Sequence, residues 1–535
     1  MPTITIRELR QLESESQSSF EAELSFDGGG RYGVTITDPF SVTEEQELEW
    51  YFERWLRRPF LDTVKAARAQ ESIRSYGEKL FDQVFADRKA YGAYDRLKGR
   101  LSEVTIEIEG ESPAFQALHW EALRDSEGDA RPLAVDGVMV RKMRQVASAQ
   151  VNASPVVNLL VVIARPDEES DVGYRTISRP LVEAIRQSQL RVSVDIVRPG
   201  TYEAFVKQFQ AKGQGYYHIV HFDMHGTLAT YEQLVSINEP AAETENSALT
   251  YRRLIDTERY GREDFQPFEG VRAYLSFEGE AKGQMDLVEA GELAQLLNHQ
   301  RIPVCLLNAC QSGKQLSGDG GEGRKGEEGK GEGGKGEGET GEGLAAQETS
   351  LGSRLMAAGM QVVVAMGYSV TVSAARILME TLYAQLFAQG DVVKAIQRGR
   401  YELYARKARR AHFNMQVRLE DWMLPVVYAN GAVDLNLRPF TAEEEEAYYE
   451  AQDGQYRFAA PTFGFVGRDL EILKIEKALL KHNVLLLRGM GGTGKTTLLN
   501  YLRGWWVDTH YAENIFYFGY DEKAYTLQQI LHGIG

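Results

Sequence analysis

The sequence predicts an α/β fold built on a mostly parallel sheet that helices cover, and three observations support this. From Val156 onward, apolar strand-like runs alternate with helical segments of about ten or more residues, which is the pattern of β-α-β units. Most of these runs are apolar throughout, as expected of strands buried on both faces. The chain has 535 residues, of which 43% are apolar, enough for about two to four domains.

The N-terminal part is expected to contain short strands followed by helices. The stretches TITIREL, FEAELSF and YGVTITD alternate as strands do. Residues 44–101 carry apolar side chains at three- and four-residue spacing, which predicts helices. VTIEIEG (Val104–Gly110) alternates like another strand, and Ser112 with Pro113 marks the start of a short helix.

The second part supplies the strands of the predicted parallel sheet. Its strand candidates are NLLVVIARPD, RVSVDIVRPG, GYYHIVHFDMHG, VRAYLSFEG, IPVCLLNACQSG and GMQVVVAMGYSV. Helix candidates, including SRPLVEAIRQ, TYEAFVKQFQAKG and VEAGELAQLLNHQ, lie between several of these strands, and two more helices are expected up to about residue 408.

Composition divides the chain further. Residues 317–344 alternate glycine with Glu, Lys and Arg, which predicts a flexible insert because nothing there can anchor a core. The acidic stretch TAEEEEAYYEAQDG indicates a linker. We therefore expect units at 1–153 and 154–440, a linker at 441–461 and a last, incomplete unit at 462–535.

Charge and cysteine content restrict the class of protein. The formal net charge of −17 argues against non-specific nucleic-acid binding through a broad basic surface. Two cysteines make no disulfide framework, so a reducing compartment is expected. The N-terminus lacks an apolar signal core, and no apolar run reaches the roughly 18 residues of a membrane span. The sequence predicts a cytoplasmic protein without a membrane partner.

The stretch GMGGTGKT (Gly489–Thr496) matches the phosphate-binding loop pattern G-x-x-x-x-G-K-[ST]. The expected strand NVLLLR precedes it and the expected helix TTLLNYL follows, which is the context this motif requires. Lys495 would reach the β- and γ-phosphates of ATP or ADP, and Thr496 would ligate Mg²⁺. The predicted nucleotide-binding residues are Gly489, Gly491, Gly492, Gly494, Lys495, Thr496 and Thr497.

This last region resembles the start of an NB-ARC or STAND-type NTPase, with FVGRDLEI (Phe465–Ile472) as the motif that precedes the nucleotide. The resemblance covers about 75 residues, and no acidic Walker B strand or sensor arginine follows. Nucleotide binding is therefore expected, whereas hydrolysis by this chain alone is not. We also expect the chain to be a fragment of a longer protein.

Three histidines, His218, His221 and His225, crowd into HIVHFDMHG. A zinc site is disfavoured, because His218 and His221 point to opposite faces of a strand and no carboxylate or thiol pattern accompanies them. A better hypothesis pairs His225 with Cys310, 85 positions later, because both are expected at carboxyl ends of apolar strands, where open α/β sheets place their sites. A strand-end cysteine alone is more often a core residue, but the paired His-Gly favours catalysis.

The roles of this pair follow from their chemistry. His225 would deprotonate the Cys310 thiol or protonate the leaving amine, and Cys310 would attack a carbonyl. The backbone N–H groups of Gly226 and Cys310 would form an oxyanion hole.

The region around these residues resembles the CHAT domain, a caspase- and separase-related peptidase domain of clan CD. HFDMHG matches its histidine motif and LLNACQSG its cysteine motif. AFQALHWEALRD, PLAVDGVMVRKM, AYLSFEG, LMAAGMQVVVAMGYSV and DWMLPVVYANG extend the resemblance over about residues 100–435. It implies a caspase-like sheet with an N-terminal pseudo-caspase half, a His225–Cys310 dyad without a cofactor, His221 as a packing residue and Cys305 in the core.

Substrate specificity stays open in the sequence. Relatives that cut after Arg or Lys carry an acid two positions before the cysteine, where this chain has Asn308. Asp223 could line the S1 pocket instead, or could be an exposed turn aspartate; Asn308 and Gln311 are also expected to line the site. The glycine-rich insert after Cys310 is either a cleavable linker or a tolerated expansion, and expansion is favoured.

The sequence as a whole predicts a caspase-like cysteine endopeptidase acting on a protein substrate. A nucleotide-binding STAND switch would regulate it by homo-oligomerisation, in bacterial defence or programmed cell death. One alternative is a catalytically silent caspase-like scaffold whose function is nucleotide-dependent assembly. Another is a P-loop enzyme with an accessory α/β domain. The protein substrate, the residue it is cut after and the activating trigger are not specified by the sequence.

Overall fold

The structure is a computed structural model of the chain. It describes residues 2–12, 17–27, 29–143, 149–166, 178–185, 190–238, 254–255, 267–279, 283–309, 350–411, 415–431, 433–452, 458–459, 462, 465, 467–520 and 523–534. Cys310, Gln311 and the glycine-rich insert lie outside these residues, so the predictions made for them are not tested by the structure.

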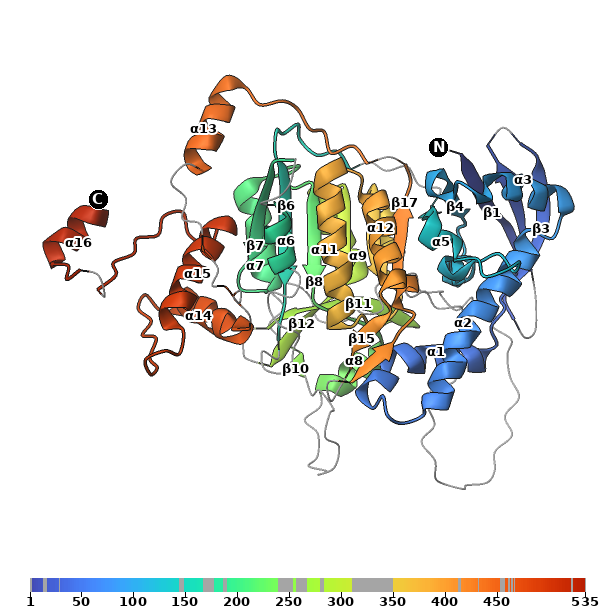
Figure 1. The fold of residues 1–535 in the computed structure, drawn as a ribbon, viewed down its shortest axis with the longest axis horizontal. Coiled ribbons are helices and arrows are strands. Elements are labelled where there is room, and N and C mark those ends of the chain that lie inside the picture. The colour runs from blue at the N-terminus through green and yellow to red at the C-terminus, as the bar shows by residue number, and fades with distance from the viewer. Residues whose placement is uncertain are drawn as a thin grey trace.

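An eleven-stranded sheet forms the centre of the molecule (Figure 1), in the order β3-β2-β1-β4-β5-β17-β14-β13-β8-β6-β7. Most neighbouring strands run parallel; the pairs β3–β2, β2–β1 and β17–β14 are antiparallel. The predicted α/β class with a mostly parallel sheet is therefore confirmed. The strands are β1 (Thr3–Leu12), β2 (Ser19–Phe26), β3 (Arg31–Thr37), β4 (Thr105–Glu109), β5 (Val138–Lys142), β6 (Val157–Ile163), β7 (Val192–Val197), β8 (Ile219–Asp223), β13 (Val304–Asn308), β14 (Val362–Met366) and β17 (Pro425–Ala429).

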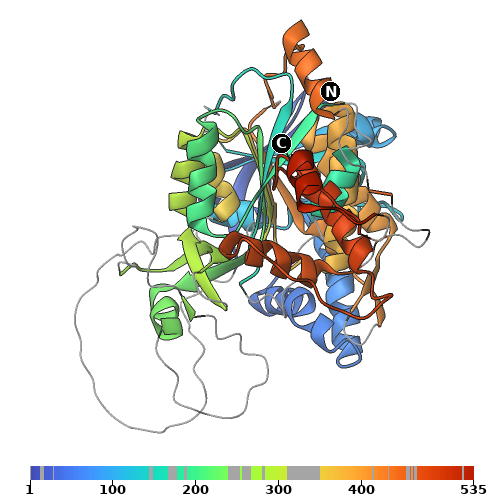
Figure 2. The ribbon, with the colours of Figure 1, turned by 90° about the vertical axis from the view of Figure 1, so that its left-hand side faces the viewer.

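Helices cover both faces of the sheet formed by β6 to β8, β13 and β14 (Figures 1 and 2). Alternate strand residues face opposite sides, so in β13 Leu306 packs with one core and Leu307 with the other. Helices α6 (Ser178–Ile185), α11 (Val372–Gln389) and α12 (Val392–Ala405) share the first core. Helices α7 (Tyr202–Lys212), α9 (Ala290–His299) and α10 (Leu351–Ala357) share the second. Two-sided burial explains why these strands are apolar throughout.

The expected N-terminal helical region is divided by short turns. It contains α1 (Val42–Glu53), α2 (Thr63–Val84) and α3 (Arg88–Lys98), with the one-turn helices η1 (Trp55–Arg57) and η2 (Leu101–Glu103). A capping box at Ser41 and Glu44 starts α1. The predicted short helix is α4 (Pro113–Ala117), followed by η3 (Trp120–Ala122) and α5 (Leu133–Asp136).

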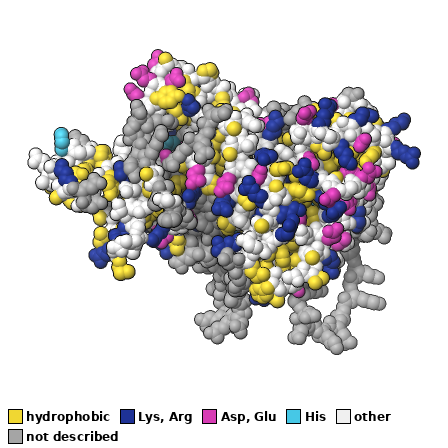
Figure 3. Space-filling model, viewed as in Figure 1, with side chains coloured by type: hydrophobic (Ala, Val, Ile, Leu, Met, Phe, Trp, Pro, Cys, Tyr) yellow, Lys and Arg dark blue, Asp and Glu magenta, His cyan; other side chains and the backbone are white. Residues whose placement is uncertain are grey.

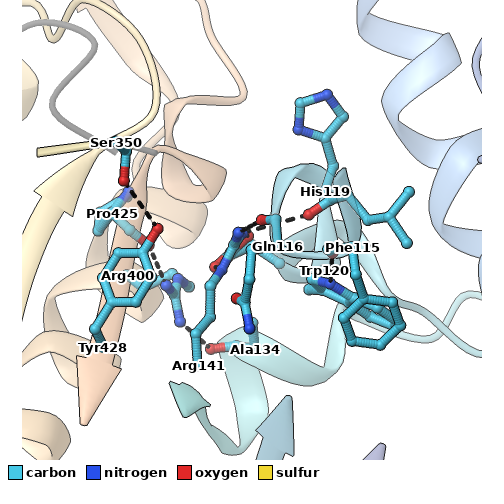
Figure 4. A network of polar contacts seen from close by, with 12 residues as sticks. Phe115, Gln116, His119, Trp120, Ala134, Arg141, Ser350, Arg400, Pro425 and Tyr428 are labelled. Carbon is cyan, nitrogen blue, oxygen red and sulfur yellow. Dashed lines mark hydrogen bonds and ion pairs between the residues drawn. The ribbon is translucent and has the colours of Figure 1, made fainter. Parts of the chain in front are cut away.

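Buried arginines lie at the junction between this N-terminal half and the second half (Figure 4). Arg400 of α12 donates hydrogen bonds to the carbonyl oxygens of Ala134 (3.3 Å) and Pro425, linking α5 to β17. Arg141 of β5 forms a buried ion pair with Glu121 (2.5 Å) and donates to the carbonyl of Gln116. These contacts occur where β5 and β17 meet, so one sheet runs through both halves.

A smaller sheet differs from the sequence prediction. Strand β11 (Val271–Glu278), expected in the parallel sheet, instead pairs antiparallel with β12 (Gln284–Glu289) and β9 (His225–Thr230). The short strand β10 (Leu254–Ile255) completes it, and α8 (Tyr231–Asn238) follows β9. A separate hairpin contains β15 (Ala408–Arg410) and β16 (Gln416–Arg418), followed by η5 (Asp421–Met423).

The C-terminal part contains α13 (Ala442–Gln452), α14 (Asp469–Lys481), α15 (Lys495–Asp508) and α16 (Leu527–Ile534). Acidic side chains gather over α13 at the upper left of Figure 3, in the segment expected as an acidic linker. The predicted strand NVLLLR is wrong: the described residues after α14 contain no strand, and Val484 is 84% exposed. A strand needs a hydrogen-bonded neighbour, and none of the described strands lies beside this run.

Within the described residues, no helix combines the length and the apolar character needed to cross a membrane.

Candidate active site

The carboxyl ends of two parallel strands, β8 and β13, meet at the candidate site. Their register places Asn308 opposite Asp223, and the Asn308 Nδ2 donates to Asp223 Oδ1 at 2.9 Å. The Met224 N–H also points to the Asn308 carbonyl, at 3.4 Å. His225 follows Asp223 by two residues and Cys310 follows Asn308 by two. The main chain therefore brings the two predicted motifs to one edge of the sheet.

His225 begins a new strand. The sequence predicted one strand through GYYHIVHFDMHG, but β8 ends at Asp223 and β9 starts at His225, in the second sheet. His225 is opposite Ser276 of β11, and Gly226 is opposite Leu275. The His225 side chain is half-buried. The change of sheet at Met224 thus turns the histidine away from the core of the parallel sheet.

Asp223 is buried, which contradicts the interpretation as an exposed turn aspartate. It is 3% exposed, and its Oδ2 forms an ion pair with Arg165 Nη2 at 2.7 Å. Arg165 Nη1 also donates to the Asp223 carbonyl oxygen at 2.7 Å. A carboxylate must be paired to be buried, and Arg165 supplies the charge. Asp223 therefore offers no uncompensated charge to a basic substrate side chain.

Arg165 is a site-forming residue that the sequence analysis missed. It directly follows the apolar run NLLVVIA and is 3% exposed. Its backbone N–H donates to Glu278 Oε1 at 2.9 Å. The signal that could have found it is an arginine at the carboxyl end of a buried strand, where a charge needs a partner.

Glu278 ends β11 and is also buried. Burial raises the pKa of Glu278, and the ammonium group of Lys477, 3.2 Å from Oε1, opposes that rise. Lys477 belongs to α14, in the C-terminal part. A residue 199 positions away from Glu278 therefore contacts the array around Asp223.

The other histidines and Cys305 are core residues. His218 accepts a hydrogen bond at Nδ1 from the Asn158 N–H, and the His221 ring bonds the Tyr383 hydroxyl. Burial lowers the pKa of His218 and of His221 to about 4. Cys305 is fully buried, and burial raises the pKa of its thiol, as expected of a core cysteine. The described residues contain no group of His, Cys, Asp and Glu able to hold a metal ion.

The glycine-rich loop at residues 489–494, which is distinct from the glycine-rich insert at 317–344, leads directly into α15, whose first residue is Lys495. Gly492 and Gly494 adopt left-handed backbone conformations, with φ of +79° and +81°. A Cβ at Gly491, Gly492 or Gly494 would meet no atom within 4 Å, so the loop is open at these three glycines. Lys495 Nζ donates to the carbonyl oxygens of Gly489 (2.9 Å) and Met490 (2.8 Å). These residues fit a phosphate group, and Thr496 and Thr497 lie in the first turn of the helix.

A cavity of about 410 Å³ lies elsewhere, between α2, η3 and the region of α12 and η5, and none of the predicted site residues lines it. Among its lining residues, Lys407 bonds Glu420, and Arg74 bonds Glu78.

Comparison with known proteins relates the chain to one family. The model of the CHAT domain matches residues 74–430, about two thirds of the chain. Among solved structures, the chain is similar to a chain of the Saccharomyces cerevisiae separase–securin complex, with 11% sequence identity and a TM-score of 0.30. That match covers 72% of this chain and 22% of the other, so the chain spans about a fifth of the relative's length. No curated protein matches the chain.

Proposed function

The chain belongs to the CHAT domain family, and on that premise we propose that it is a cysteine endopeptidase that uses His225 and Cys310. The family match and the mostly parallel sheet both support a caspase-like peptidase scaffold. The His–Cys dyad and the cleavage of a protein substrate are our proposal.

The proposed reaction has two steps. His225 takes the proton of the Cys310 thiol, and the thiolate attacks the carbonyl carbon of the scissile peptide bond. The N–H groups of Gly226 and Cys310 donate to the oxygen that becomes negative. His225 returns the proton to the amine as the C–N bond breaks, leaving a thioester. Water then attacks the thioester with His225 as base, releasing the acid and the free thiol.

One observation carries this proposal: the 2.9 Å hydrogen bond from Asn308 to Asp223. It joins the residue two positions before Cys310 to the residue two positions before His225, on strands that pair in parallel. A nucleophile and its base must lie within hydrogen-bond reach during the reaction. Each predicted residue follows this paired position by two in the sequence, which supports a dyad beside this edge of the sheet.

Asp223 does not favour cleavage after a basic residue, because Arg165 already neutralises its carboxylate. We therefore expect the preferred residue to be selected by other groups, among them Asn308 and Gln311.

We further propose that the region from Phe465 binds ATP or ADP with Mg²⁺ and regulates the peptidase. The left-handed glycines and the position of Lys495 at the start of α15 support phosphate binding, although the strand expected before the loop is absent from the described residues. Lys495 would hold the negatively charged phosphates of the nucleotide, and Thr496 would hold the Mg²⁺ bound with it. The resemblance to STAND proteins implies homo-oligomerisation on activation and a role in bacterial defence or programmed cell death, with the protein located in the cytoplasm.

A peptide library tests the peptidase proposal. Wild type, Cys310→Ala and His225→Ala are compared with and without ATP, and Cys305→Ala serves as the matched control because Cys305 is buried in β13. Cleavage is expected in wild type and Cys305→Ala, and is expected to be lost in the other two variants. Absence of Cys310-dependent cleavage in all conditions would favour the catalytically silent scaffold.

The same proteins show whether the glycine-rich insert is a cleaved linker. Incubation of wild type and Cys310→Ala is followed by mass spectrometry for fragments split between residues 318 and 343. We expect no such fragments, since we propose that the insert is a tolerated expansion; fragments confined to wild type would show autoprocessing.

A further inference from the structure

Two adjacent residues of α14 contact the peptidase part of the chain. Lys477 Nζ lies 3.2 Å from Glu278 Oε1, and Glu476 Oε2 lies 2.9 Å from Arg198 Nε. Arg198 and Glu476 have side-chain exposures of 7% and 2%, so this contact is well shielded from water. Two ion pairs of opposite polarity, side by side and one of them buried, define one orientation of α14 against the sheet.

Glu278 connects this contact to the candidate active site by a continuous set of hydrogen bonds. Its Oε1 accepts the Arg165 N–H at 2.9 Å. The Arg165 guanidinium then holds both the carboxylate and the carbonyl oxygen of Asp223, each at 2.7 Å. Asp223 is two residues from His225.

Glu278 also reaches His225 by a second route, through the small sheet. It lies on β11 two residues after Ser276, which is directly opposite His225 on β9. Residues two apart on a strand lie on the same face, so Glu278 and Ser276 share a face of β11. A displacement of Glu278 at the end of β11 would therefore also move Ser276, the residue opposite His225.

The other end of α14 contacts the glycine-rich loop. Arg468, which directly precedes α14, donates from Nη2 to the Thr493 carbonyl oxygen at 2.8 Å. Along the same helix, Glu476 Oε1 accepts from the indole N–H groups of Trp505 (3.0 Å) and Trp506 (2.9 Å). Both tryptophans belong to α15, which begins at Lys495. A shift of the loop or of α15 on binding phosphate would therefore displace α14, and with it Glu476 and its neighbour Lys477.

We propose that Glu278 is a positioning residue for the dyad, and that its contact with Lys477 couples the glycine-rich loop to His225. The inference rests on the proposed peptidase and names the path by which the nucleotide-binding region regulates it. With α14 docked as in the structure, the Lys477 ammonium group favours the ionised form of Glu278 against the effect of burial, and the ionised carboxylate is the stronger acceptor for the Arg165 N–H. Arg165 in turn orders Asp223 and the start of β9.

Four full-length variants test the coupling. Lys477→Ala removes the contact, and Lys481→Ala is the matched control because Lys481 is an exposed lysine at the end of the same helix. Glu278→Gln keeps an acceptor for the Arg165 N–H but cannot pair with Lys477. The double variant Lys477→Ala/Glu278→Gln completes a double-mutant cycle.

The expected result is a fall in kcat of about fivefold or more for Lys477→Ala, with KM changed by less than about twofold, since a positioning residue does not touch the substrate. The effect of ATP on the rate is expected to disappear with it. The double variant should be no slower than the slower single variant, and Lys481→Ala should match wild type. Additive losses in the cycle would overturn the inference.

Hydrogen exchange of the segment 219–230 gives a readout that needs no catalysis. Lys477→Ala should accelerate exchange there by about threefold or more, corresponding to roughly 0.7 kcal/mol of local stability, whereas Lys481→Ala should not. If wild type shows no Cys310-dependent cleavage, the peptidase proposal fails, and accelerated exchange would still establish the coupling. If exchange in Lys477→Ala equals that of wild type, or if the wild type cleaves and exchange changes in Lys477→Ala while its cleavage rate does not, the coupling is wrong.

Discussion

Removing one member of the Arg165–Asp223 ion pair should destabilise the protein strongly, because both side chains are buried. In Asp223→Ala the guanidinium of Arg165, 3% exposed, keeps carbonyl partners but loses its counter-charge. Breaking a buried pair from one side costs about 3–5 kcal/mol. At about 2–4 °C per kcal/mol for a cooperative unit of this size, the expected fall in Tm is roughly 6–20 °C.

Three further variants separate the charge from the shape. Asp223→Asn keeps an acceptor oxygen and should cost less, about 1.5–3 kcal/mol, the value of a hydrogen bond to a charged group. Arg165→Met alone leaves the Asp223 carboxylate buried with the Asn308 amide and should be destabilising too. Arg165→Met/Asp223→Ala removes both charges and should be more stable than the sum of the single losses by about 2 kcal/mol or more, because a buried pair replaced as a whole is often neutral.

The assay is chemical denaturation of the wild type and the four variants, followed by circular dichroism, together with thermal melts at neutral pH. The double-mutant cycle gives the coupling free energy directly. A loss below about 1 kcal/mol in Asp223→Ala, or additive losses in the double variant, would refute the assignment of a buried ion pair at the end of β8.

Three other predictions concern stability and thiol chemistry. Burial lowers the pKa of His218 and His221 to about 4 from an unfolded value of about 6.5, so both are neutral in the fold. Their contribution to the free energy of unfolding is complete above pH 6.5 and is lost as pH falls toward 4, by up to about 3 kcal/mol each. The fall in Tm between pH 7 and pH 5 should therefore be smaller in His221→Gln. Gly77→Ala should destabilise by about 1–3 kcal/mol or more because its Cβ would lie 1.9 Å from the Ala122 carbonyl oxygen, whereas Gly92→Ala, with no atom within 4 Å, should stabilise α3 by about 0.5–1 kcal/mol; equal melting curves would contradict this. In Cys310→Ala, the remaining thiol of Cys305 should react with a disulfide reagent only after denaturation, because burial raises its pKa and blocks access, and fast reaction in the native protein would argue against a core position.

Local patterns in the sequence were sufficient for most elements of the fold. Strands such as β6 and β13 were predicted from their apolar runs, α11 from apolar spacing, and α15 as the helix that follows the phosphate-binding motif. These signals are local because a helix closes its hydrogen bonds within four residues, and because a strand buried on both faces is apolar along its length. The adjacency of the two predicted motifs also followed from the sequence, since parallel strands end at one edge.

What the sequence alone could not determine depends on partners far along the chain. The run NVLLLR has the composition of a strand, yet a strand exists only beside another one, and none of the described strands pairs with it. Strand β11 looked like a member of the parallel sheet, but its pairing with β9 and β12 puts it in the small sheet.

The charges around the candidate site were likewise decided by tertiary structure. Asp223 was predicted to line a substrate pocket or to be exposed, whereas Arg165, 58 residues earlier, buries and neutralises it. Glu278 meets Lys477 across 199 residues. The sequence predicted His225 and Cys310 as a dyad at strand ends, and β8 and β13 end two residues before these positions. Only the tertiary structure determined which charges surround that edge, because electrostatic partners are selected by proximity in space and leave no periodic pattern in the chain.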